Sequence, residues 1–433
     1  MTRARNRVFY GWWVVLVAAF SMLLGPIPIS VFSFAIFLRP LTHELHSSRG
    51  AVSLAFTLHA TMTALTLTFA GRLIDRFGPR KVILVSSLLT GLVFLSANLC
   101  SGKLWQLYLF YAASGVASCG VAPVSYSDVI SHWFDRRRGT ALGLIMAGLG
   151  IGAVVMPSAA HSVISTFGWR TVFVFSGWAI LLISLPVLAL FLKDRPQQMG
   201  LAPDGGSSAF TGFDTRDSDS GASFGDALRT PTLWLLLCAF VLVSSSVSGC
   251  TAHIAAILAD QGLSARTAAL ATSVFGGGLL VGRTGSGYLL DRFFAPRVAA
   301  LIFGCAAAAM GLLRVAGTQG TAFAAAFVIG LGLGAEIDVM AYLTSRYFGL
   351  RSFGAINGFL FAGFGVAAGS GAYLMGASFD LTGSYAAALM LFCILTLIGA
   401  VLMMRLGPYR YQKSLTDDRA RELRLIEPES QVS

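Results

Sequence analysis

G-R-L-I-D-R-F-G-P-R-K, residues 71–81, returns as G-Y-L-L-D-R-F-F-A-P-R, residues 287–297, about 216 positions later. Both stretches carry Gly, Leu, Asp-Arg-Phe and Pro-Arg in the same order. A second pair of stretches, W-F-D-R-R-R-G-T-A-L-G-L-I-M-A-G-L-G from Trp133 and Y-F-G-L-R-S-F-G-A-I-N-G-F-L-F-A-G-F-G from Tyr347, lies at nearly the same offset. Two matches at one offset indicate a duplicated chain with two similar halves.

The sequence around these repeats is strongly apolar. Of the 433 residues, 55% are hydrophobic and only 12% are charged, which excludes a soluble globular domain of this length. Twelve apolar stretches of about 20 residues or more are each long enough to cross ~30 Å of hydrocarbon as a helix, and too long for the strands of a barrel. We predict an all-α membrane protein with twelve transmembrane helices in two pseudo-symmetric six-helix bundles.

The predicted domains are an N-terminal bundle (1–192), a cytoplasmic linker (193–230), a C-terminal bundle (231–407) and a cytoplasmic tail (408–433). Gly, Ser, Asp and Thr crowd together in the linker, which favours a flexible connection. With the amino terminus inside, 24 of the 31 Lys and Arg residues fall on inner loops and tails and 6 on outer loops. Because positive loops are retained in the cytoplasm, we expect a multi-pass protein of a bacterial-type cytoplasmic (inner) membrane, with both termini cytoplasmic.

Composition also limits the kinds of function. The six Cys residues lie in apolar runs without paired spacing, and the His residues are scattered, so we predict no disulfide framework, no metal site, no cofactor and no enzyme. The net charge of +11 follows the inner loops, so we expect no nucleic acid as a partner. The expected partners are the lipid bilayer and a small substrate, with no obligatory protein partner.

The first span contains Gly25-Pro26-Ile27-Pro28 in its middle. Paired prolines remove backbone hydrogen bonds, so the helix should break or bend there. Broken helices at membrane depth are tolerated where they line protein or a cavity. This span is therefore a candidate cavity wall.

Arg283 is the one cation in the middle of a predicted span, about eight residues, roughly 12 Å of helix, from the Asp291 end. A guanidinium at that depth in hydrocarbon costs at least ~2.5 kcal/mol, so it should face a protein interior or a wet cavity. Its planar fork offers two parallel hydrogen bonds to a carboxylate. Arg283 is therefore the predicted substrate-binding residue, and the alternative is a structural ion pair with Glu336 or Asp338.

Glu336 and Asp338 lie near the middle of the predicted tenth span. Burial favours a protonated acid, whereas a nearby Arg283 favours the charged form, so one of these two acids is the predicted carrier of a co-transported proton. Tyr342 shares a helix face with Asp338, four residues away, and is a candidate for a further hydrogen bond to substrate.

Two more polar residues are candidates for substrate binding. His253 lies four to seven residues inside the outer end of the predicted seventh span, where it could close the site from outside or relay protons, or simply pack with a hydrogen bond. Tyr126, in the inner third of the fourth span, could donate to a carboxylate.

Residues 71–81 fit the pattern G-x-x-x-D-R-x-G-x-R-K in full, and the chain therefore resembles the major facilitator superfamily, whose inner loop between spans 2 and 3 carries that motif. The resemblance implies that acid and bases of this loop lock the inner ends of the two halves in one state. The implied gating residues are Asp75, Arg76, Arg80, Lys81, Arg136 and Arg138, with Asp291 and Arg292 in the repeat. The alternative is an ordinary turn in a positive inner loop.

The stretch from Trp133 to Gly148 is similar to the span 5 signature of the monocarboxylate porter group within that superfamily. Arg283 falls where monocarboxylate and oxalate/formate porters carry a substrate-binding arginine. The resemblance implies a secondary active transporter of pyruvate-like or lactate-like monocarboxylates, coupled to protons and working by alternating access. The alternative is an organic-anion exchanger of the oxalate/formate type, but those porters use a second cation on span 11, and residues 352–379 hold no Lys or Arg.

Overall fold

The structure, a computed structural model, describes residues 9–134, 137–201, 221–349 and 351–409. Helices make up nearly all of this part of the chain, and a single isolated backbone bridge joins Gly221 to Gly349. In chain order the elements are α1 (Tyr10–Leu23), η1 (Pro28–Phe32), α2 (Phe34–Glu44), α3 (Arg49–Phe77), α4 (Pro79–Leu95), η2 (Ser96–Leu99), α5 (Leu104–Ala117), η3 (Ser118–Val121), α6 (Pro123–Trp133), α7 (Arg138–Phe167), α8 (Trp169–Ala179), η4 (Ile180–Ser184), α9 (Leu185–Phe191), η5 (Pro196–Met199), α10 (Phe224–Leu228), α11 (Pro231–Asp260), α12 (Ala265–Arg292), α13 (Ala295–Arg314), α14 (Gln319–Phe348), α15 (Phe353–Thr382) and α16 (Ala386–Met404).

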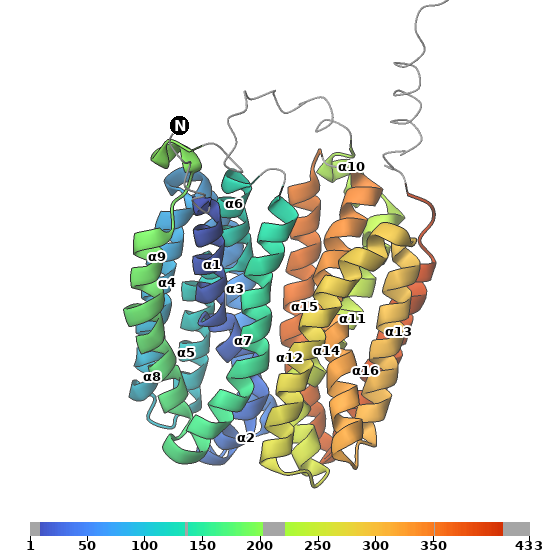
Figure 1. Ribbon diagram of the computed structural model, residues 1–433. Coiled ribbons are helices and arrows are strands. Elements are labelled where there is room, and N and C mark those ends of the chain that lie inside the picture. The colour runs from blue at the N-terminus through green and yellow to red at the C-terminus, as the bar shows by residue number, and fades with distance from the viewer. Residues whose placement is uncertain (1–8, 135–136, 202–220, 350, 410–433) are drawn as a thin grey trace, which may run out of the picture.

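The helices run up and down in two groups, with α1 to α9 on one side and α11 to α16 on the other (Figure 1). Short segments such as α1, η1 and α2 join end to end, so each group consists of six rods. We call the end where α1 begins and α16 finishes the terminal face, and the opposite end, where α3 and α12 begin, the distal face. The predicted fold class of two six-helix bundles is confirmed.

Eleven segments of the described chain are long and apolar enough to cross a membrane. The long helix outside that set is α12, whose 28 residues include Arg283 and several glycines. It lies alongside α14 for most of its length in Figure 1 and occupies the position of the predicted eighth span. Its lower hydropathy reflects Arg283 and the small residues that let it pack closely on α14.

The predicted break in the first span is present. The α-helix ends at Leu23, and a π-helical segment, Pro28–Phe32, precedes α2. The freed backbone is partly satisfied by Ser33, whose hydroxyl donates to the carbonyl oxygen of Pro28 at 2.8 Å. Proline thus interrupts this rod at membrane depth, as its missing N–H requires.

Close glycine packing joins α12 to α14. The contact glycines are Gly278 and Gly282 on α12 and Gly330 and Gly334 on α14. A Cβ added to Gly282 would lie 2.2 Å from the carbonyl oxygen of Leu331, and one added to Gly334 would lie 2.1 Å from that of Leu279. Only glycine permits this approach, which fixes Arg283 of α12 against α14.

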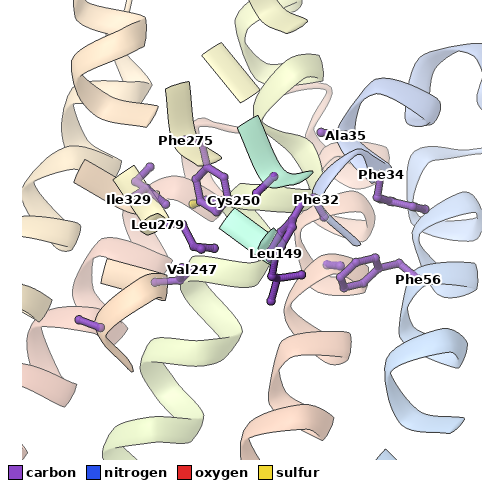
Figure 2. Packing of buried hydrophobic residues seen from close by; sticks show 14 of the residues in the cluster. Phe32, Phe34, Ala35, Phe56, Leu149, Val247, Cys250, Phe275, Leu279 and Ile329 are labelled. Carbon is purple, nitrogen blue, oxygen red and sulfur yellow. The ribbon is translucent and has the colours of Figure 1, made fainter. Parts of the chain in front are cut away.

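The two halves meet through apolar residues of both groups of helices (Figure 2). Phe32, Phe56 and Leu149 come from the first half, and Val247, Cys250, Phe275 and Leu279 from the second. Backbones also approach closely between α7 and α12, where a Cβ on Gly276 would lie 2.3 Å from the carbonyl oxygen of Ala153. Close packing here places Arg283 at the boundary between the halves.

Candidate functional site

Arg283 lies on α12 where the two halves meet. Its Nη1 group donates to the sulfur of Met146, on α7 of the other half, at 3.3 Å. Its Nε lies 3.6 Å from Oδ2 of Asp338 on α14, in the same half. The arginine side chain is 16% exposed, so its charged group is largely but not completely buried.

Of the two acids that the sequence offers as ion-pair partners of Arg283, Asp338 is the one that lies beside it. A separation of 3.6 Å is an ion pair without a good hydrogen bond. Thioether sulfur is a weak acceptor, and a guanidinium has five N–H donors in a fork. Most of the donor capacity of Arg283 therefore remains for a bidentate carboxylate.

Glu336 points elsewhere. It has no exposed surface, and neither carboxyl oxygen has a hydrogen-bond partner among the described residues. Two residues along a helix turn the side chain to a different face, which separates Glu336 from Asp338 and Arg283. Burying a charge without a partner costs much free energy, so the neutral carboxylic acid is the form of Glu336 that fits this site.

Tyr342 lies one turn beyond Asp338 toward the terminal face, as the i, i+4 spacing predicts. Its hydroxyl accepts from Nη2 of Arg346 at 3.1 Å, and the Arg346 guanidinium lies 5.0 Å from its ring centroid. Asp338, Tyr342 and Arg346 thus follow one face of α14 from mid-helix toward the terminal face.

Tyr126 is buried inside the first half. Its hydroxyl lies 2.7 Å from the hydroxyl of Ser21, which also accepts from Ser184 at 3.1 Å. This triad joins α6, α1 and η4 around the break in the first rod. In the conformation described, Tyr126 is engaged there and not with Arg283.

His253 is completely buried on α11 in the distal part of the interface. One ring nitrogen lies 2.9 Å from the Ser53 hydroxyl and 3.0 Å from the carbonyl oxygen of Ala372, and the other lies 2.9 Å from the Tyr385 hydroxyl. Ser53 belongs to the first half and the other three residues to the second, so His253 joins the halves.

Four of the predicted gating residues have described side chains. Arg80 is the best connected: its backbone N–H donates to Asp194 at 2.7 Å and its Nη2 to the carbonyl oxygen of Ala189 at 2.6 Å. Arg76 lies over the ring of Phe77, Arg292 lies over the ring of Tyr288, and Lys81 is exposed. These described contacts stay within one half each.

Arg136 lies outside the described residues. Asp75, Arg138 and Asp291 are placed in helices, but their side chains lie outside the described part of the chain. Sequence reasoning missed Asp194, which accepts a hydrogen bond from Arg80 in the motif of residues 71–81. The only signal for it was an acid between two bases, Lys193 and Arg195, at the start of the linker.

Sequence reasoning also missed a charged cluster at the distal face. Arg39 and Arg49 of the first half both contact Asp260 of the second, and Asp380 of the second half contacts the first turn of α3. The available signal was the charge at the distal ends of the spans, with Arg39 and Arg49 in the first half and Asp260 and Asp380 in the second. No group of three or more potential metal ligands is found among the described residues.

Comparison with known proteins gives a consistent picture. A sequence model of the Major Facilitator Superfamily matches residues 12–348 and 254–429. The chain is 26% identical over 330 residues to an "Oxalate:formate antiporter" of Oxalobacter formigenes, covering 75% of this chain and 73% of that protein. It is 26% identical over 411 residues to "Monocarboxylate transporter 11" of Mus musculus, covering 92% and 88%.

Among solved structures, a bacterial homologue of the human lysosomal transporter Spinster, in an inward-facing and occupied conformation, superimposes with a TM-score of 0.65 at 17% identity. The match covers 92% of this chain and 97% of that one. At this identity the likeness concerns the fold.

Proposed function

The chain belongs to the major facilitator superfamily, and from this premise we propose that it is a secondary active transporter of a small monocarboxylate, coupled to a proton. The superfamily match makes it a multi-pass membrane transporter, not an enzyme. The pyruvate-like or lactate-like substrate class rests on Arg283 and on the relatives, which include a monocarboxylate transporter and an oxalate:formate antiporter.

The observation that carries the proposal is the state of Arg283. Arg283 is a mid-helix cation where the two halves meet, with a long ion pair to Asp338 on one side and a weak sulfur acceptor on the other. A carboxylate inserted there would gain two charge-assisted hydrogen bonds without leaving a better partner unpaired. Arginine suits this role because it stays protonated at every relevant pH.

Asp338 is the group that we assign to the proton. Its side chain is 36% exposed, so a proton can reach it, whereas Glu336 is fully buried. A substrate carboxylate on Arg283 takes away the cation that stabilises charged Asp338 and adds a like charge beside it. Both changes favour proton uptake by Asp338, which couples substrate to proton.

Tyr342 is the proposed second donor to substrate, since it lies one turn from Asp338 and its hydroxyl is held by the charged Arg346. We assign His253 to closure of the site on the distal side, where it already joins Ser53 to Tyr385. Tyr126 would contribute in another state of the cycle, after release from Ser21.

Alternating access agrees with the distribution of contacts. Among the described residues, the hydrogen bonds between halves run from Arg39 and Asp260 at the distal face to Arg283 and Met146 nearest the terminal face. We propose that the terminal face is cytoplasmic, as the basic loops indicate, and that the loop around Asp75 and Arg80 locks that face when the distal side opens.

The test is uptake of a panel of labelled monocarboxylates and dicarboxylates into proteoliposomes. We expect uptake of small monocarboxylates that an inward proton gradient accelerates. Absence of uptake for all monocarboxylates, with the protein folded and correctly inserted, would refute the substrate class.

An exchange mechanism is the second candidate, favoured by the similarity to an oxalate:formate antiporter. Counterflow that depends on internal anion and not on pH would select it. A second cation for a dianion is absent from residues 352–379, which favours monoanions under either mechanism.

A further inference from the structure

Charged groups of the two halves meet at the distal face. Arg39, in the middle of α2, and Arg49, the first residue of α3, both donate to the carboxylate of Asp260, the last residue of α11. Arg49 makes a second bond to this carboxylate, from Nη2 to Oδ1 at 3.0 Å. Both cations belong to the first half and the acid to the second.

A second carboxylate of the C-terminal half sits on the first turn of α3. The backbone N–H groups of Arg49 and Gly50 donate to Oδ1 and Oδ2 of Asp380 at 3.0 and 2.8 Å. The next amide, that of Ala51, donates to the hydroxyl of Ser48. The first N–H groups of a helix lack partners within the helix and carry partial positive charge, so they bind anions. Here the bound anion is a side chain of the other half.

The approach of Asp380 depends on glycine. A Cβ on Gly50 would lie 2.7 Å from Oδ2 of Asp380 and 3.0 Å from the backbone nitrogen of Ala377. A Cβ on Gly376 would lie 2.8 Å from the backbone of Gly50. The two helices are thus shaped to bring this carboxylate onto the amides.

Aromatic residues of the second half hold Arg49 in place. Its guanidinium carbon lies 3.8 Å from the ring centroid of Phe379, and Nη1 donates to the hydroxyl of Tyr385 at 2.8 Å. The Arg49 side chain is only 15% exposed, whereas those of Arg39 and Asp260 are 48% and 27% exposed. Anions in the distal medium can therefore reach the edge of this cluster.

All donors of the cluster lie on the first half, and both carboxylates lie on the second. We define the distal donor set as the guanidinium groups of Arg39 and Arg49 with the backbone N–H groups of Arg49 and Gly50. Any movement that parts the halves at the distal face removes Asp260 and Asp380 from these donors. The donors stay together, because they lie on consecutive segments of one half.

We propose that the distal donor set is a carboxylate-binding site, filled by Asp260 and Asp380 when the distal face is closed and by a small carboxylate anion when it opens. An external anion competes with the acids of the protein, so it favours the open distal face and is captured there. Partly exposed ion pairs are weak and screened, which makes the exchange feasible. The inference extends the proposed function to a second site, remote from Arg283.

The test measures the opening of the distal face directly. Spin labels on Thr166→Cys and Leu381→Cys, exposed positions of the two halves at that face, report the distance between α7 and α15 by pulsed EPR, with the six native cysteines replaced. Potassium acetate replaces potassium chloride at constant ionic strength. The same titration is run on Arg283→Gln, Arg49→Gln, Asp380→Asn and Lys103→Gln chains.

We expect acetate to increase the population with the longer distance in the parent chain and in Arg283→Gln, and to have no effect in Arg49→Gln. Asp380→Asn should raise this population about fivefold without acetate, because the negative charge is lost and the amide keeps an acceptor for only one of the two backbone N–H groups. Lys103→Gln removes an exposed cation of the same face and should behave as the parent.

An acetate response that disappears in Arg283→Gln would overturn the inference, because the anion would then act through Arg283. The inference would also be overturned if Asp380→Asn raises the open population but acetate has no effect on the parent chain. The cluster would then be only a set of contacts that holds the distal face closed. If no monocarboxylate is transported but acetate still opens Arg283→Gln, the proposed substrate class fails and the distal site stands.

Discussion

The contacts of Arg283 define what its replacement should do. Lysine keeps the charge but offers no planar fork, so it cannot bind a carboxylate through two parallel bonds. We expect Arg283→Lys to lower kcat/KM for monocarboxylate uptake at least about tenfold, equal to ~1.4 kcal/mol of lost interaction. Initial rates in proteoliposomes, with thermal unfolding as a check on folding, measure this.

Arg266→Lys is the matched control, since Arg266 is an exposed arginine at the distal start of the same helix. Its uptake should equal that of the parent. Normal transport by Arg283→Lys would contradict bidentate binding of the substrate carboxylate by Arg283.

Replacing each of the two acids of α14 should affect proton coupling differently. Asp338→Asn removes the exchangeable proton beside Arg283, so uptake should no longer respond to a pH gradient. Glu336→Gln replaces a buried, unpartnered acid and should keep that response. Uptake with and without an inward proton gradient distinguishes them, and an unchanged response in both variants would clear Asp338 of the role.

For single residues, the sequence predicted that Arg283 lies deep in a membrane span, but not which residues it contacts. Arg283 stood out because a single guanidinium interrupts an apolar run, and its ion pair with Asp338 was one of two alternatives. The contact with Met146 and the pairing of Arg49 with Asp260 were not predictable, because each joins residues of different halves. Helix periodicity gives the face of a side chain on its own helix, but not which helix lies opposite.

The element that positions the site is the pair α12 and α14, and glycine decides how closely they approach. A Cβ on Gly282 would lie 2.2 Å from the carbonyl oxygen of Leu331, so Gly282→Ala should lower the free energy of unfolding by about 1–3 kcal/mol through overpacking. Nothing lies within 4 Å of a Cβ on Gly285, so Gly285→Ala should raise it by about 0.5–1 kcal/mol.

Thermal unfolding of the two variants in the same detergent compares them directly. Equal stability of Gly282→Ala and Gly285→Ala would contradict the close packing of α12 on α14. The sequence showed many glycines on span 8 but could not separate the contact positions from the open ones, since that depends on the position of α14.

The first rod illustrates what is predictable for an element. Its break follows from Pro26 and Pro28 alone, because a missing N–H is a local property. The π-helical form of the segment after it was not predicted, since it depends on how the freed carbonyl groups find partners such as Ser33.

For the whole molecule, the contacts between the halves predict that a disulfide between them should stop transport reversibly. The hydroxyl oxygens of Ser158 on α7 and Ser273 on α12 lie 2.7 Å apart across the interface. In a chain without its native cysteines, Ser158→Cys with Ser273→Cys should form a disulfide that holds the distal side closed and stops uptake. A reductant should restore transport.

Each single cysteine variant is the control and should transport under oxidising conditions. Full uptake by the cross-linked double variant, with disulfide formation shown by mass, would mean that the halves do not separate there during transport.

The duplicated architecture itself was predictable, because repeated stretches at one offset and long apolar runs are properties of the chain alone. Which face is closed was not, since both states share one sequence.

The glycine contact between α12 and α14 has a consequence for the energetics of the return step. Because it binds these two helices into one body, Arg283 and Asp338 travel together, while Met146 belongs to the opposite half. In the proposed cycle, the unloaded carrier reorients with the charges of Arg283 and Asp338 cancelled, and the loaded carrier reorients with a monoanion and a proton added. Neither passage moves net charge, so we expect a pH difference to drive accumulation and the membrane voltage, worth ~2.3 kcal/mol per charge per 100 mV, to leave it unaffected.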